Sequence, residues 1–97
     1  LVVAELFKTS LHRGDEPAMY FWRTAAGSEV DLIIETQAGL VPIEIKASST
    51  ARPQMAKDIQ AFRRDFGDRA ARGFVIYPGL STLPLGDGVL ALPLAAL

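Results

Sequence analysis

Apolar and polar residues alternate most clearly between Ser28 and Ala47, and this alternation predicts a β-hairpin. In the first strand, 28–35, the residues divide into one face with Glu29, Asp31 and Ile33 and another with Val30, Leu32 and Ile34. In the second strand, 40–47, Val41, Ile43 and Ile45 alternate with Pro42, Glu44 and Lys46. The short segment 36–39 between them ends in glycine, which favours a tight turn.

The expected register of this hairpin brings charged residues together. If Gln37 and Ala38 form the loop, Thr36 pairs with Gly39 and Asp31 lies opposite Glu44. The same register places Glu29 opposite Lys46. Two carboxylates in direct opposition repel each other, at a cost of a few tenths of a kcal/mol to about 1 kcal/mol. The pattern therefore predicts a positive charge between Asp31 and Glu44, either Lys46 or a divalent cation.

Aromatic residues in 19–23 predict a strand before the hairpin. Tyr20 and Trp22 share one face of this strand, while Met19 and Phe21 share the other. Such a run is typical of core and sheet-surface packing, and a platform for stacking nucleobases is the alternative. Before it, residues 1–11 carry apolar side chains four positions apart and predict a helix.

A second helix is predicted after the hairpin by apolar residues at helical spacing. The stripe consists of Met55, Ile59, Phe62 and Phe66. The hydroxyls of 48–50 are expected to cap this helix, Pro53 suits its first turn, and Gly67 is expected to end it.

The remaining pattern predicts strands at 73–77 and 89–92, a loop at 80–88 and a final turn at 94–97. The fold class is therefore α/β. We expect a mixed sheet in the order helix, strand, strand, strand, helix, strand and short strand, with a parallel crossover through the second helix.

Length and composition limit the function classes. The 97 residues, 49% hydrophobic and without cysteine, suit one domain spanning 1–97. No apolar run reaches the roughly 20 residues that cross a bilayer, and no signal peptide is evident, so we expect a cytoplasmic location and no membrane partner. Because the chain opens in the middle of a helical pattern, we expect it to be part of a longer chain.

The net charge of −1 argues against nonspecific binding of nucleic acid over the whole surface. The segment 46–72 is nevertheless locally basic, with seven basic and three acidic residues. A solvated helix face explains this segment, and contact with nucleic acid is the alternative.

The charged residues of the hairpin suit metal-dependent chemistry. Asp31, Glu44 and the backbone carbonyl of Ile45 offer the oxygen ligands that Mg²⁺ prefers. Lys46 beside them is able to position or deprotonate a water, or to stabilise charge on a phosphate oxygen. These residue types in this pattern indicate hydrolysis of a phosphodiester. An ion-paired exposed strand face is the simpler interpretation.

The segments FWRTAAGSEVDLIIE and LVPIEIKAS resemble the PD-(D/E)xK nuclease superfamily, in which Asp31 matches the aspartate and Glu44-Ile45-Lys46 matches E-x-K. The whole chain is more narrowly similar to domain-of-unknown-function family 4143, which follows an AAA+ ATPase module in prokaryotic proteins. The opening LVVAELFK and the closing GVLALPLAAL fit that family as well. Val30 precedes Asp31 where proline is usual in the superfamily.

This resemblance implies a restriction-endonuclease-like core and a site with named roles. Asp31, Glu44 and Lys46 would be catalytic, and Asp31, Glu44, the Ile45 carbonyl and additionally Glu5 would bind Mg²⁺ or Mn²⁺. Arg63 and Arg64 are candidates for contact with DNA, and Gln60 for the polar side of the cleft. Two functions follow: a DNA nuclease domain coupled to the ATPase domain of the same parent chain, or a nuclease-like fold that binds DNA or protein without cleaving.

Overall fold

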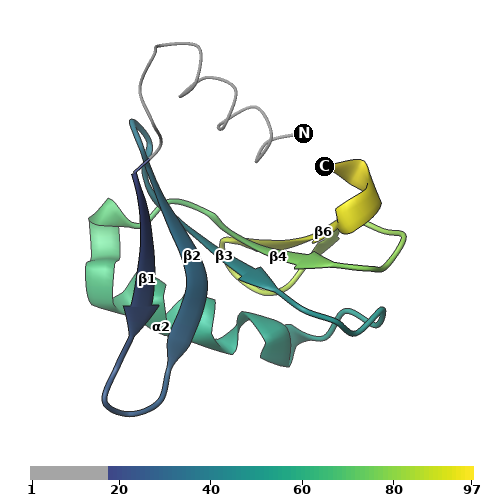
Figure 1. The fold of residues 1–97 in the computed structure, drawn as a ribbon, viewed down its shortest axis with the longest axis horizontal. Helices are drawn as coiled ribbons and strands as arrows, with labels where there is room; N and C mark the ends of the chain where they lie inside the picture. The colour runs from purple at the N-terminus through teal and green to yellow at the C-terminus, as the bar shows by residue number, and fades with distance from the viewer. Residues whose placement is uncertain (1–17) are drawn as a thin grey trace.

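The computed structural model describes residues 18–97, and the predicted helix at 1–11 lies outside them. Strands β1 (Met19–Arg23), β2 (Glu29–Thr36) and β3 (Gly39–Ile45) form an antiparallel meander (Figure 1). Pairs from Thr36–Gly39 to Leu32–Ile43 have the predicted register. Gly39 has a φ of +124°, and a Cβ there would lie 2.6 Å from a backbone carbonyl, so the turn requires glycine.

Strand β2 contains a β-bulge that the alternation pattern did not predict. Trp22 pairs with Val30 and Tyr20 with Ile33, so three steps along β2 oppose two along β1. Val30 and Ile33 therefore pack in the same core cluster, whereas Leu32 packs in another. The expected grouping of Val30 with Leu32 and Ile34 is wrong, because the extra residue breaks the two-residue period.

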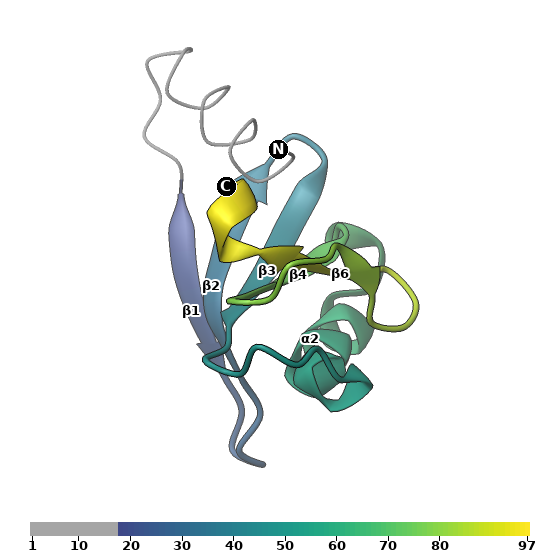
Figure 2. The same ribbon diagram turned by 90° about the vertical axis from the view of Figure 1, so that its right-hand side faces the viewer.

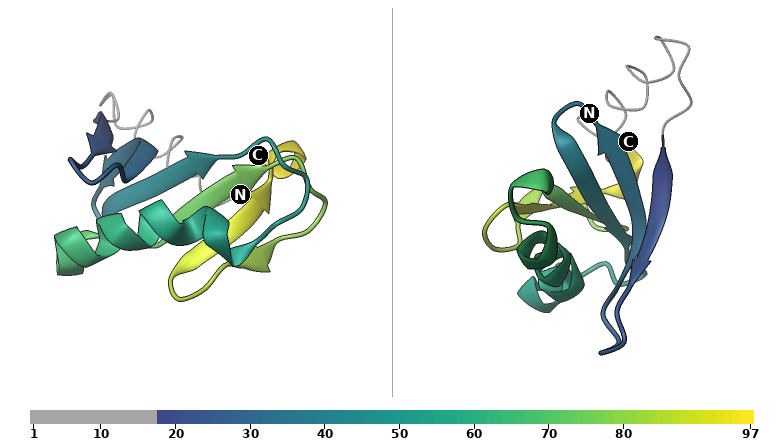
Figure 3. Two further views of the ribbon diagram at one scale, coloured as in Figure 1. Left: turned by 90° about the horizontal axis from the view of Figure 1, so that it is seen from below. Right: turned by 90° about the vertical axis from the view of Figure 1, so that its left-hand side faces the viewer.

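The second predicted helix is present, and its apolar stripe faces the sheet. It comprises η1 (Pro53–Ala56) and α2 (Lys57–Phe66), and the separate short turn η2 (Gly67–Arg69) follows. Ile59 and Phe62 are buried, while Met55 and Phe66 pack against the same cluster. Figures 2 and 3 show α2 lying across one face of the sheet. The helix ends at Gly67, which has a φ of +54°, as expected.

The predicted capping by the hydroxyls of residues 48–50 is wrong. The helical segment begins at Pro53 after Arg52, and no side chain caps it. The Ser48 hydroxyl instead accepts a hydrogen bond from the Thr50 amide at 3.2 Å. The hydroxyl is thus used within its own turn, three residues or more before the helix.

After α2 the chain adds parallel strands and one strand that the sequence did not reveal. These elements are β4 (Gly73–Tyr77), β5 (Leu83–Pro84), β6 (Val89–Pro93) and the final turn η3 (Leu94–Ala96). Strand β4 is parallel to β3 and β6, which confirms the crossover. Strand β5 lies within the expected loop, so the mixed sheet has six strands in the order β1-β2-β3-β4-β6-β5, rather than the expected five. The class is α/β.

The two faces of the sheet carry separate core clusters. The cluster beneath α2 includes Val30, Ile59, Phe62 and Val75. The cluster of the other face includes Ile34, Ile43, Phe74 and Ile76. Residues of β4 alternate between the two and are all buried, so this strand forms the centre of the fold. No helix in 18–97 is long and apolar enough to cross a membrane.

Candidate functional site

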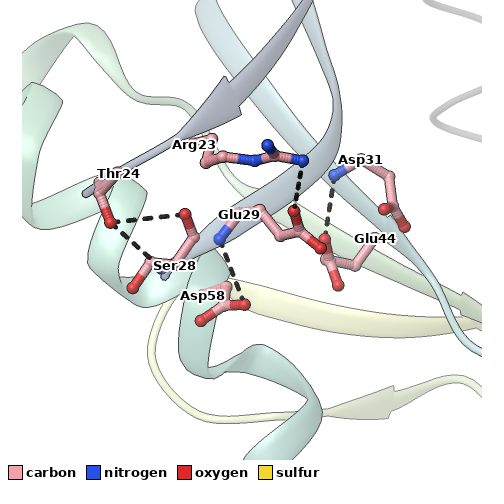
Figure 4. A network of polar contacts seen from close by, with 7 residues as sticks. All are labelled: Arg23, Thr24, Ser28, Glu29, Asp31, Glu44 and Asp58. Carbon is pink, nitrogen blue, oxygen red and sulfur yellow. Dashed lines mark hydrogen bonds and ion pairs between the residues drawn. The ribbon is translucent and has the colours of Figure 1, made fainter. Parts of the chain in front are cut away.

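Asp31 and Glu44 are joined where the ladder of β2 and β3 ends. The last backbone pair is Leu32–Ile43, and at the next position the backbone amides donate to side-chain carboxylates of the opposite strand. The amide of Asp31 donates to Glu44 Oε1 at 3.0 Å, as Figure 4 shows. In return, the amide of Ile45 donates to Asp31 Oδ2 at 2.9 Å. Each carboxylate thus accepts a hydrogen bond from the opposite strand, which offsets their repulsion.

Glu44 and Lys46 form a short ion pair at the same place. Lys46 Nζ lies 2.9 Å from Glu44 Oε2, with 5% of the Glu44 side chain and 37% of the Lys46 side chain exposed. Burial raises the pKa of Glu44, and the hydrogen bond from Lys46 only partly offsets this effect. The same hydrogen bond raises the pKa of Lys46. Lys46 thus places a positive charge beside Glu44, which is one of the two arrangements that the hairpin pattern predicts.

Strand alternation directs the backbone carbonyl of Ile45 toward β2 rather than β4. The amide of Lys46 donates to the Ile76 carbonyl of β4, so the next residue toward the N-terminus directs its backbone groups the other way. The Ile45 amide does so by bonding to Asp31. Because the N–H and C=O of one strand residue point to the same side, we expect the Ile45 carbonyl on the Asp31 side, and its role as a metal ligand stays a prediction.

Glu29 does not lie against Lys46, which corrects the second expected pair. Its carboxylate is 3.4 Å from the guanidinium of Arg23 on β1. The amide of Glu29 donates to Asp58 Oδ2 at 3.4 Å (Figure 4). On the N-terminal side of Asp31, strand β2 thus contacts β1 and α2, while β3 remains paired with β4.

Asp58 is a neighbour of the site that sequence reasoning missed. It lies in the first turn of α2, and its charge contributes to the raised pKa of Lys46. An acidic residue in the first turn of the helix after the Glu44-Ile45-Lys46 strand was the available signal. Asp58 thus adds negative charge near Lys46.

Arg63, a candidate for contact with DNA, and Gln60, a candidate for the polar side of the cleft, both have contacts within the fold. Arg63 donates to the carbonyls of Ala71 at 3.3 Å and Asp87 at 2.9 Å. Gln60 also donates to the Asp87 carbonyl, at 2.9 Å. Both side chains therefore attach α2 to the turn before β6. Arg64 is exposed, and its contact with DNA stays a prediction.

The donor set fits a magnesium ion in its chemistry. Mg²⁺ takes one or two carboxylates and keeps several waters, and Asp31, Glu44 and the Ile45 carbonyl supply oxygens of this kind. Within residues 18–97, no group of three acidic, histidine or cysteine side chains is arranged to hold a metal. Glu5, the additional ligand expected, lies outside the described residues.

Comparison with known proteins identifies relatives without a described activity. A family model described as "Domain of unknown function (DUF4143)" matches residues 1–97. "Uncharacterized protein Mb2031c" of Mycobacterium bovis and "Uncharacterized protein Rv2008c" of Mycobacterium tuberculosis are each 35% identical over 75 residues, or 77% of this chain. The match covers 16% of each relative. No solved structure matches.

Proposed function

We propose, from the premise that this chain belongs to the DUF4143 family, that it is a PD-(D/E)xK nuclease-like domain which hydrolyses phosphodiester bonds of DNA with Mg²⁺ or Mn²⁺. It would act in the cytoplasm beside an ATPase domain of the same parent chain. The convergence of Asp31, Glu44 and Lys46 at the end of one hairpin supports this proposal. A strand face with only a structural role has no need for two carboxylates locked in opposition.

The protonation states suit distinct roles for these side chains. A bound magnesium ion would polarise the phosphate and lower the pKa of a bound water. Lys46 has a raised pKa and is therefore charged at neutral pH. Its ammonium is then a donor to a phosphate oxygen rather than a base that removes a proton. The carboxylates of Asp31 and Glu44 would hold the metal, with the Ile45 carbonyl beside them.

A fold that binds DNA or protein without cleaving is the second candidate function. The observation that favours it is the engagement of Glu44, because Lys46 and the amide of Asp31 already occupy its two oxygens. A metal would have to compete with this ion pair. The Glu44–Lys46 pair then serves as a structural link in the sheet.

Metal titration of the 97-residue chain separates the two candidates. We expect addition of Mg²⁺ or Mn²⁺ to shift the amide NMR signals of Asp31, Glu44 and Ile45, and expect Asp31→Asn and Glu44→Gln to abolish these shifts. The same variants should lower cleavage of DNA by about 100-fold or more, the usual effect of removing a group that stabilises charge in the transition state.

Asp65→Asn is the matched control, since it removes an exposed carboxylate of α2 outside the site. It should leave shifts and cleavage unchanged. Absence of shifts and of cleavage at millimolar metal would contradict the nuclease proposal. Binding of labelled DNA under those conditions would then favour the non-cleaving module.

A further inference from the structure

A cavity of about 300 Å³ lies at the opposite end of α2 from the candidate site. We call it the aromatic cavity. Its walls include the side chains of Tyr20, Phe21, Trp22, Phe62 and Phe66. Ile33 and Leu40 of β2 and β3 also line it, together with the charged residues Glu35 and Arg69. The Asp31 site does not use any of these residues.

The rings give the aromatic cavity flat walls. Trp22 meets Phe62 edge to face, with ring centroids 5.4 Å apart. Phe66 stacks on Phe62 at 4.5 Å. Tyr20 is 51% exposed and Trp22 and Phe66 are half-buried, so solvent reaches these rings. Flat rings open to solvent accept another flat ring by stacking.

The charged residues of the cavity have no polar partner among residues 18–97. The Arg69 guanidinium lies over the Phe66 ring, 5.4 Å from its centroid. Within that part of the chain the Glu35 carboxylate takes part in no hydrogen bond or ion pair, although the backbone amide of Glu35 donates to the Ala18 carbonyl. A negatively charged acceptor, Glu35, and a positively charged donor, Arg69, thus border the apolar aromatic cavity. This combination complements a planar group with hydrogen-bond donors and acceptors on its edge.

Strand β2 connects the cavity to the candidate site. Ile33 and Glu35 lie two and four residues beyond Asp31, which corresponds to about 6 to 13 Å along a strand. Ile33 packs in the cluster beneath α2, and Glu44 lies on the same side of the sheet because it pairs with Val75 of that cluster. A polymer with one phosphate at Asp31 can therefore present a neighbouring unit to the cavity.

We propose that the aromatic cavity binds a nucleobase of single-stranded nucleic acid. This inference rests on the proposed function, because that function supplies the nucleic acid. The base stacks on the exposed Tyr20 ring, its exocyclic amine donates to Glu35, and Arg69, which lies over Phe66, donates to a base carbonyl or to the adjacent phosphate. A paired base cannot enter, since its edge and both faces are already occupied.

The single tryptophan of the chain, Trp22, lines the cavity and provides the measurement. The chain is titrated in EDTA with short oligodeoxycytidylate, with oligodeoxythymidylate and with a mixed-sequence duplex. We expect single strands to quench Trp22 fluorescence and the duplex not to do so. Oligodeoxycytidylate should bind more tightly than oligodeoxythymidylate, because only cytosine has an exocyclic amine for Glu35.

Matched variants test the assignment of the cavity. Phe66→Leu keeps an apolar side chain but removes the ring over which the Arg69 guanidinium lies, and Arg69→Gln removes an exposed charge with little risk to folding. Each should weaken binding of single strands about tenfold. Arg72→Gln makes the same charge change at an exposed residue outside the cavity and should alter binding less than twofold. Glu35→Ala should remove the preference for cytosine.

The outcomes keep this inference distinct from the proposed function. Cleavage that persists while Phe66→Leu and Arg69→Gln bind normally would overturn the cavity assignment alone. If the chain binds no metal while single strands still quench Trp22 fluorescence in EDTA, the nuclease proposal alone is overturned. Quenching by an apolar peptide but by no oligonucleotide would overturn the base-binding inference in favour of a protein partner.

Discussion

At the scale of single residues, the Glu44–Lys46 pair determines how the site responds to pH. A carboxylate with 5% of its side chain exposed depends on its ammonium partner for solvation. Because burial raises the pKa of Glu44, its native form retains a proton at a pH where the unfolded chain has lost it. Burial of this carboxylate therefore lowers stability as the pH rises through that window, and Lys46 offsets only part of this loss.

Lys46→Ala should accordingly lower the free energy of unfolding by about 1–3 kcal/mol at pH 7.5, because it leaves a buried charge without its partner. Part of this loss should return at pH 5, because removal of Lys46 also removes an interaction that lowers the pKa of Glu44 and so favours its protonated form. Urea denaturation at the two pH values measures both effects. Lys57→Ala, an exposed lysine of α2, is the control. An equal loss at both pH values would contradict a burial effect on Glu44.

At the scale of elements, α2 holds the sheet through an apolar stripe on one side and polar contacts on another. The stripe was readable from sequence because apolar residues three and four apart occupy one helix face. The contacts of Arg63 and Gln60 with the carbonyl of Asp87 were not readable. They join residues 24 or more positions apart, and a charged residue on a helix has the same sequence pattern whether it faces solvent or a distant carbonyl.

Neighbouring arginines of α2 should therefore behave differently. Arg63→Gln should lower the free energy of unfolding by about 1–3 kcal/mol, because the carbonyls of Ala71 and Asp87 lose a charged donor. Arg64→Gln should change it by less than about 0.5 kcal/mol, as is usual for an exposed side chain. Thermal or urea denaturation of the two variants measures the difference. Equal stabilities would show that the Arg63 contacts contribute no net free energy.

The hairpin shows how far sequence reasoning extends to the site. The turn and the two-residue period gave the register of β2 and β3, and thereby the opposition of Asp31 and Glu44. The bulge at Val30 was not predictable, because it depends on pairing with β1 as well as on the β2 sequence. The same long-range dependence hid β5, a two-residue strand whose partner is β6.

At the scale of the molecule, strand order predicts where the native structure opens most readily. Strand β4 lies between β3 and β6 with all five residues buried, whereas β1 and β5 are the two edges of the sheet. Hydrogen exchange of backbone amides should therefore be slowest in β4 and fastest in β5, with β1 exchanging faster than β3. Exchange in β1 as slow as that in β4 would mean that the edge is covered in the native chain.

The hairpin that unites Asp31 with Glu44 also carries a lesson for comparing relatives. The two carboxylates meet because the number of residues between them is compatible with one shared face. A relative that gained or lost one residue between Asp31 and Thr36, with the pairing at the turn kept and no bulge formed, would keep every charged residue and still direct one carboxylate to the opposite side. Alignment of such proteins should therefore compare the length of this segment as well as its residues, since an insertion there separates the two carboxylates as surely as a substitution removes one.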